Sequence, residues 1–170
     1  MYYYRITKYN PKYRDGIAYT KMDEWISISC IGDPKYRNPT ANEYLRVEDN
    51  YWNTMKYLLQ LCHITSMRMK RIEKHHDLPF FFTQNKFFDI RPLEEAIKKR
   101  KPIGIDEIEM ATRLCLREEM WCMLEGEGKT FIHFGYDYYM FFGTEIDHTI
   151  DFSFVPKGIY IEDFKSPYVK

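Results

Sequence analysis

Residues 40–62 read TANEYLRVEDNYWNTMKYLLQLC and contain both the start signal and the apolar face of a long helix. Thr40 and Glu43 have the spacing of a capping box, in which the Thr40 hydroxyl accepts a hydrogen bond from the Glu43 N–H and Glu43 reaches back. The apolar positions behind the box recur every three or four residues, and three more lie beside them: Tyr44, Val47, Tyr51, Met55, Leu58 and Cys62, then Leu45, Trp52 and Leu59. This pattern predicts a helix over 41–62 that is buried on more than one side.

Short runs of aromatic and β-branched residues on both sides of this helix predict strands. These runs lie at 2–9, 25–31, 67–72 and 158–161. The segments 130–134 and 138–142 predict either a hairpin around Gly135 or one long strand with a bulge at that glycine.

Residues 145–154 alternate in polarity, which predicts a further half-buried strand. Its polar face carries Glu145, Asp147 and Asp151. Its apolar face carries Ile146, His148, Ile150, Phe152 and Phe154.

A second long helix is predicted over 106–125, because Asp106 is a good N-cap and Glu109 stands three residues further on. A short helix is plausible over 92–99, with a proline at its first position, and 78–88 resembles a loop or short strand. Together these elements predict a single α+β domain over residues 1–170, with a largely antiparallel β-sheet packed against two main α-helices.

The 170 residues carry no net charge, with 25 Lys and Arg against 25 Asp and Glu, and 18% of them are aromatic. A zero balance argues against a strongly cationic nucleic-acid binder and against a polybasic membrane-surface protein. There is no apolar run of about 18 residues and no signal-peptide pattern, so we expect a cytoplasmic protein without direct nucleic-acid or membrane contact. The oligomeric state is not predicted.

The charge is nevertheless sorted along the chain. Residues 1–101 carry 19 basic and 12 acidic side chains, whereas 102–170 carry 6 and 13. Whether the two halves are also separated in space depends on the topology.

The four cysteines, at positions 30, 62, 115 and 122, have no CxxC spacing, so zinc-ribbon and thioredoxin-type motifs are absent. Cys115 and Cys122 would lie about 10 Å apart along one helix, too far for a disulfide. We therefore expect reduced thiols in the core.

No motif in the sequence supports a catalytic residue, a metal site or a cofactor site. A ribonuclease could use His133, or the adjacent His75 and His76, as acid and base, but their spacing does not favour this. Glu145, together with the other acids of the 145–154 segment, could gather metal ions, although such a face is more often simply solvated.

The densest aromatic segment, 131–142, contains no Lys or Arg, which argues against a base-stacking platform for single-stranded nucleic acid. Tyr and Trp are frequent anchors of protein–protein interfaces. Exposed tyrosines with acidic neighbours favour a protein partner, and more specifically a basic one.

Four stretches of the chain resemble small immunity proteins of bacterial polymorphic-toxin systems, including contact-dependent growth inhibition. They are YRITKYNP at 4–11, DEWISISCIG at 23–32, EYLRVED at 43–49 and FIHFGYDYYM at 131–140. The chain departs from the family pattern at Cys30, where the family has Asp. The resemblance implies a cytoplasmic protein that binds a cognate toxin C-terminal domain, often a nuclease, and covers its active site.

An acidic surface could imitate the polyanionic substrate of such a toxin, because clefts that bind RNA are commonly basic. The toxin-binding residues hypothesised on this ground are Glu118, Glu119, Tyr136, Asp137, Tyr138, Asp147 and Asp151. Two alternatives remain: a small hydrolase or nuclease-like enzyme that uses His133 or the 145–151 acids, and a general protein-interaction module.

Overall fold

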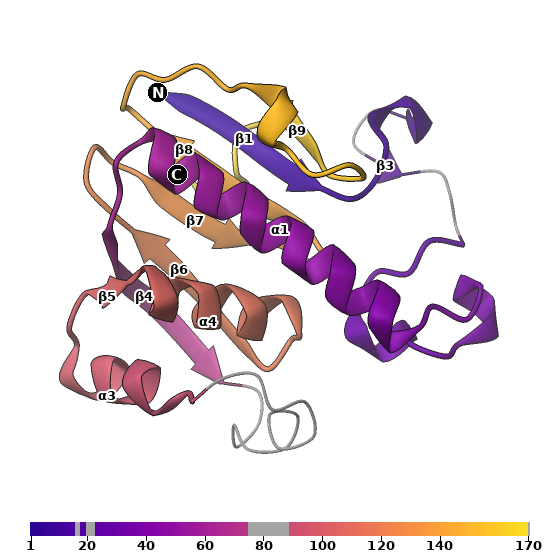
Figure 1. Cartoon of the computed structure of the whole chain (residues 1–170), viewed down its shortest axis with the longest axis horizontal. Helices are drawn as coiled ribbons and strands as arrows, with labels where there is room; N and C mark the ends of the chain where they lie inside the picture. The colour runs from indigo at the N-terminus through magenta and orange to yellow at the C-terminus, as the bar shows by residue number, and fades with distance from the viewer. Residues whose placement is uncertain (16–17, 20–22, 75–88, 170) are drawn as a thin grey trace.

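The computed structural model describes residues 1–15, 18–19, 23–74 and 89–169 and forms a single α+β domain, as predicted (Figure 1). Its main sheet has seven strands in the order β5-β4-β6-β7-β8-β1-β9, and every neighbouring pair is antiparallel. The strands are β1 Tyr2–Thr7, β4 Ser66–Lys74, β5 Ile103–Gly104, β6 Met120–Glu125, β7 Phe131–Phe134, β8 Met140–Thr144 and β9 Tyr160–Asp163. The helices are α1 Ala41–Leu61, α3 Arg91–Lys99 and α4 Ile105–Leu116.

Smaller elements connect these parts. A two-stranded ribbon pairs β2 with β3, and four short 3-10 helices lie in the connections. Their bounds are β2 Arg14–Asp15, β3 Ala18–Tyr19, η1 Pro11–Tyr13, η2 Ile28–Cys30, η3 Pro34–Tyr36 and η4 Phe152–Phe154.

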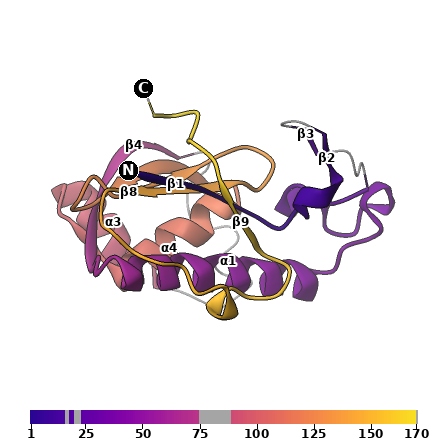
Figure 2. The ribbon, with the colours of Figure 1, turned by 90° about the horizontal axis from the view of Figure 1, so that it is seen from above.

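The helices lie on one face of the sheet, and residues 164–169 lie on the other (Figure 2). The core is buried between the sheet and the helices, with Ile132 and Phe142 on the sheet side and Leu58 and Leu114 on the helix side. On the opposite face Ser166 Oγ lies 2.9 Å from His133 Nδ1, and the Tyr168 ring lies 6.3 Å from the Phe141 ring. Both faces of the central strands are therefore covered.

The first predicted helix is confirmed as α1, and its start is fixed as expected. The Glu43 N–H donates to Thr40 Oγ1 at 3.1 Å. Both faces of the wide stripe are buried, with Tyr51, Met55 and Leu58 fully inaccessible.

The prediction of a helix over 106–125 is wrong in its second half. Helix α4 ends at Leu116, the chain turns through Glu118 in a left-handed conformation (φ 60°), and β6 follows. The cap is also different, because Gly104 is the N-cap and its N–H donates to Glu107 Oε2 at 2.9 Å. The short apolar run at 120–124 fits both a helix and a strand. It forms a strand because it pairs with β4 on one side and with β7 on the other.

This correction brings two cysteines together. Cys115 on α4 and Cys122 on β6 have their Sγ atoms 3.7 Å apart, instead of lying two turns apart on one helix. All four cysteines are free and buried, as predicted, and burial raises the pKa of Cys115, with a further contribution from Cys122.

Two predicted strands do not form. Residues 145–154 leave the sheet after Thr144, because β1 lies between β8 and β9 and the chain must cross β1 to reach β9. Residues 25–31 form a loop with η2, in which Trp25 is buried against the rings of Tyr44 and Tyr138.

The remaining local predictions fare better. Strands β1 and β4 form where they are predicted, β9 begins two residues later than predicted, and β7 and β8 form the hairpin alternative. Helix α3 begins one residue early, so that Pro92 is its second residue. The 78–88 segment, like His75 and His76, lies outside the described residues.

The topology mixes the two charge halves of the chain. Basic residues of the first half pair with acids of the second, as Arg5 and Arg14 do with Glu162 at 3.1 and 3.0 Å. The sorting of charge along the sequence is thus partly cancelled in space. Within the described residues, no helix is long and apolar enough to cross a membrane.

Candidate functional site

A pocket of about 470 Å³ opens at the turn between β7 and β8, and we call it the aromatic pocket. The turn, the end of α4, the start of β6 and residue 168 form its walls. Six aromatic side chains line it: Trp121, Phe134, Tyr136, Tyr138, Tyr139 and Tyr168. Two carboxylates, Glu118 and Asp137, complete the lining, and no Lys or Arg of the described residues belongs to it.

The β7–β8 turn presents one aromatic ring to solvent. Tyr136 is 87% exposed, the highest value among the large exposed hydrophobic residues of the described chain. The Gly135 N–H donates to the Tyr139 carbonyl at 2.9 Å, which closes the turn. A Cβ at Gly135 would lie 2.8 Å from the Phe141 ring, so this position needs glycine.

Three residues around the pocket have left-handed backbone conformations without being glycine. They are Glu118, Asp137 and Tyr138, with φ of 60°, 57° and 64°. Each such conformation costs about 1 kcal/mol or more and persists only where the surrounding structure enforces it. Because strain of this kind gathers at binding sites, it marks the pocket as a candidate functional site.

The floor of the pocket is a rigid cluster of buried rings. Tyr138 lies 5.0 Å from the rings of both Trp25 and Tyr51. The Tyr51 hydroxyl donates to the Tyr138 carbonyl at 2.7 Å, and the Tyr9 hydroxyl donates to the Asp137 carbonyl at 2.8 Å. Burial raises the pKa of Tyr138 well above its ordinary value, so the ring stays neutral. The turn is thereby held in place before any partner arrives.

A buried ion-pair network anchors the α4 wall. Glu48 on α1 is fully buried and accepts hydrogen bonds from Arg113 at 2.9 Å and from Arg117 at 2.7 Å. Burial disfavours the charged form of Arg113, but bonds to Glu109, Asp49 and Glu48 outweigh it and raise its pKa. The last turn of α4, which leads into Glu118, is therefore fixed against α1.

The structure brings together four of the seven hypothesised toxin-binding residues, namely Glu118, Tyr136, Asp137 and Tyr138. Tyr138 contributes from below, since it is only 5% exposed. Glu119 is 7% exposed and does not line the pocket.

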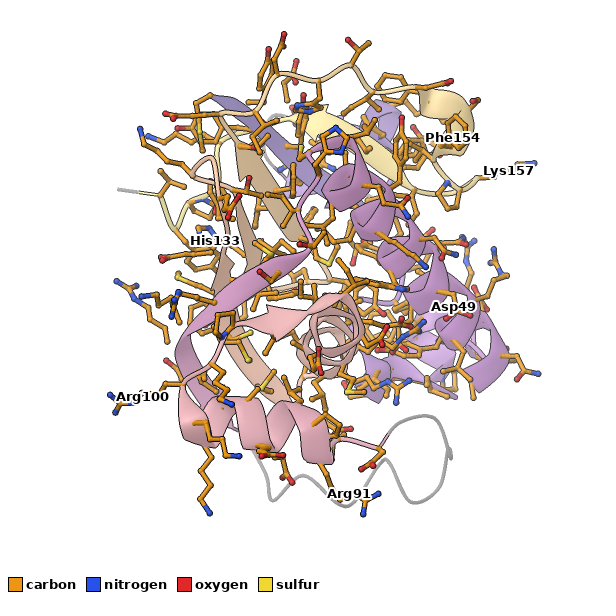
Figure 3. All side chains as sticks on the ribbon, turned by 60° about the vertical axis from the view of Figure 1, so that its left-hand side comes forward. Asp49, Arg91, Arg100, His133, Phe154 and Lys157 are labelled. Carbon is orange, nitrogen blue, oxygen red and sulfur yellow. The ribbon has the colours of Figure 1, made fainter. Side chains whose placement is uncertain are left out.

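Asp147 and Asp151 lie apart from the pocket, on the crossover between β8 and β9. Asp147 accepts a hydrogen bond from the Tyr2 hydroxyl at 2.5 Å, beyond the far end of β8. Asp151 caps η4 by accepting from the Ser153 N–H at 2.9 Å, which lowers the pKa of its carboxyl group. Figure 3 shows this crossover, marked by Phe154, on the opposite side of the molecule from His133.

Sequence reasoning missed two of the pocket's walls. Trp121 falls within the helix predicted over 106–125, but it lies on β6. Its indole N–H donates to the Phe134 carbonyl, with a distance of 2.8 Å between the nitrogen and the oxygen. Tyr168 has no neighbouring pattern in the sequence, yet its ring lies 5.7 Å from that of Trp121. Only the pairing of β6 with β7 could have placed them.

The candidate catalytic histidine lines a different pocket, on the sheet face that carries residues 164–169. His133 is 6% exposed, its Nδ1 lies 2.9 Å from Ser166 Oγ, and its ring stacks on Phe131. Burial, with a smaller effect of Arg71, lowers the pKa of His133 to about 4, so it is neutral at pH 7. Neither Asp147 nor any other acid of the crossover lines this pocket.

No group of three or more His, Cys, Asp and Glu side chains within the described residues could hold a metal ion. Searches of protein-family models, curated proteins and solved structures find no match.

Proposed function

We propose that this protein neutralises a cognate bacterial toxin domain, a nuclease as the resemblance implies, by covering its active site with the surface around the aromatic pocket. The observation that carries the proposal is the pocket itself, with six aromatic side chains and two carboxylates. Half of its twelve lining residues, 134–139, belong to the FIHFGYDYYM block, one of the four on which the resemblance rests.

The chemistry of the pocket suits a basic protein partner. Tyr and Trp contribute large contact areas with little loss of side-chain entropy, and they dominate binding energy at interfaces. The carboxylates of Glu118 and Asp137 add negative charge beside the exposed Tyr136 ring. A basic active-site cleft would be attracted to this surface at long range and anchored by the aromatic residues on contact.

Rigidity of the turn also favours a binding role. Hydrogen bonds from Tyr9 and Tyr51 hold the backbone of Asp137 and Tyr138 in place. A preorganised surface loses less entropy on association, which is what a tight inhibitor requires.

The hydrolase alternative receives less support from the geometry. His133 has a pKa of about 4, which makes it a weak base at neutral pH, and Ser166 occupies its Nδ1. The acids of the 145–151 segment serve as a cap and as a hydrogen-bond acceptor for Tyr2.

The test is co-expression of this chain with the toxin domain encoded by the neighbouring gene, followed by co-purification and an assay of toxin activity. A stoichiometric complex with abolished activity is expected. Tyr136→Ala should weaken binding by about 30-fold or more, as expected for an anchor residue. The side chain is 87% exposed, so this variant should fold normally.

Phe152→Ala is the matched control, because Phe152 is also an exposed aromatic residue (64%) but lies on the crossover. It should leave the affinity within about twofold of the parent protein. Failure to inhibit the toxin would overturn the proposed function. Loss of binding in Phe152→Ala but not in Tyr136→Ala would instead move the binding surface to the crossover.

A further inference from the structure

A second pocket, of about 520 Å³, lies on the sheet face opposite the helices, and we call it the basic pocket. Lys70, Arg71 and Lys129 line it, against a single carboxylate from Glu125. Tyr168 lines both this pocket and the aromatic pocket, so one ring separates a basic hollow from an acidic one.

A β-bulge places two consecutive basic residues in this pocket. Lys70 pairs with Met123 and Glu73 with Trp121, so that two residues of β4 stand opposite one residue of β6. In a regular strand, neighbours point to opposite faces of the sheet. Here Arg71 takes a left-handed conformation (φ 48°), and its side chain lines the same pocket as that of Lys70.

The positive charge continues beyond the pocket. An adjoining hollow of about 390 Å³ between β4 and α3 shares Lys70 and Arg71 and adds Arg68, Arg100 and Lys101. None of the described residues that line this second hollow is acidic. Six basic side chains thus face one carboxylate across the two hollows, and a concave surface focuses their field.

Two of these cations, Lys70 and Lys129, form ion pairs that are exposed to solvent. The Lys70 ammonium is 3.9 Å from Glu125, and both side chains are at least half exposed. Lys129 pairs with Glu145 at 2.7 Å on the surface, with the lysine side chain 75% exposed. Exposed pairs of this kind contribute little, so a ligand with more charge can replace them.

We propose that the basic pocket binds a phosphate group. A phosphate dianion matches the excess positive charge, and a guanidinium such as that of Arg71 binds its oxygens with two parallel hydrogen bonds. The volume lies in the range of small-ligand sites, which leaves room for an organic group on the phosphate. His133, which is neutral at pH 7, also lines the pocket and adds no fixed charge.

This site is independent of toxin binding, since its cations lie on β4 and beside β7 and none of them lines the aromatic pocket. The experiment is calorimetric titration of the full chain at low salt with three probes: inorganic phosphate, adenosine monophosphate and adenosine. Binding of either phosphate probe without binding of adenosine supports the proposal. Comparing the affinities for inorganic phosphate and for adenosine monophosphate shows whether the site prefers a free anion or a phosphate ester.

Arg71→Asn is the test variant, because Asn tolerates the left-handed backbone while the guanidinium group is removed. It should weaken phosphate binding by about tenfold or more. Arg37→Asn is the matched control, since Arg37 is also left-handed (φ 62°) and lines neither hollow. Its affinity should equal that of the parent protein.

Two results would overturn the proposal. One is the absence of binding at millimolar concentrations of both phosphate probes. The other is an affinity that stays unchanged in Arg71→Asn, provided that the unfolding midpoint shows the variant to be folded.

Discussion

The two pockets share the ring of Tyr168 but are built by opposite means. The aromatic pocket rests on buried groups, with the Tyr138 ring below it and the buried Glu48 carboxylate behind its α4 wall. The basic pocket is formed by exposed cations on a bulged strand, held by surface ion pairs. The first surface is thus suited to a partner of fixed shape, and the second to a small, highly charged ligand.

The largest expected difference between the pockets concerns their ion pairs. Glu48→Ala should lower the free energy of unfolding by about 3–5 kcal/mol, because it leaves the buried Arg113 and Arg117 without their shared carboxylate. Urea denaturation of the purified variant measures this change. Loss of the proposed toxin binding is expected alongside, because α4 loosens beside the aromatic pocket.

Glu125→Ala is the corresponding change at the basic pocket and should cost no more than about 0.5 kcal/mol, since its pair with Lys70 is exposed. If Glu48→Ala and Glu125→Ala lowered the free energy of unfolding equally, the difference in burial between the two ion pairs would not determine their contributions to stability.

An effect smaller than that of Glu48→Ala is expected from pH at the basic pocket. The pKa of His133 is about 4 in the folded protein, below its usual value of about 6.5, so the unfolded chain takes up the proton first. The stability from neutral His133 is therefore complete above pH 6.5 and is lost as the pH falls towards 4, by roughly 1–3 kcal/mol in all. Unfolding of the parent protein and of His133→Gln between pH 4 and 7.5 isolates this effect from other groups. A constant difference between the two proteins would contradict it.

The last prediction concerns backbone strain at the bulge. Arg71→Gly relieves the left-handed conformation but also frees the unfolded chain, so its stability should lie within about 1 kcal/mol of the parent protein, on the stabilising side. Phosphate affinity should fall as it does in Arg71→Asn. A destabilisation of several kcal/mol would show that the Arg71 side chain is needed for the fold itself.

Local signals in the sequence were enough to place the elements whose start and face are both encoded nearby. Helix α1 is the clearest case, since the cap at Thr40 and the buried stripe from Tyr44 to Leu58 belong to one segment. The strand β6 was missed because its apolar residues also fit a helix. The 145–154 segment was missed because the insertion of β1 between β8 and β9 is a long-range property.

The same distinction applies to the candidate site. Tyr136, Asp137 and Tyr138 could be grouped from the sequence because they are consecutive residues of one turn. Trp121 lies on the central strand β6, and Tyr168 lies in the segment 164–169 on the sheet face opposite the helices. Only the folded sheet brings the two residues to the same pocket. That Lys70 and Arg71 lie in one pocket could not be predicted, since alternation along a regular strand would place them on opposite faces of the sheet.

The position of β1 between β8 and β9 has a consequence for synthesis of the protein. Arg5 meets Glu162 across the sheet, 157 residues later in the sequence, so β1 finds neither neighbour until most of the chain has left the ribosome. Pairings of such high sequence separation make folding slow, because a long loop must close before its contacts form. A nascent chain therefore exposes the aromatic residues of β1 longer than those of any helix, and chaperone capture during translation is expected to involve this strand.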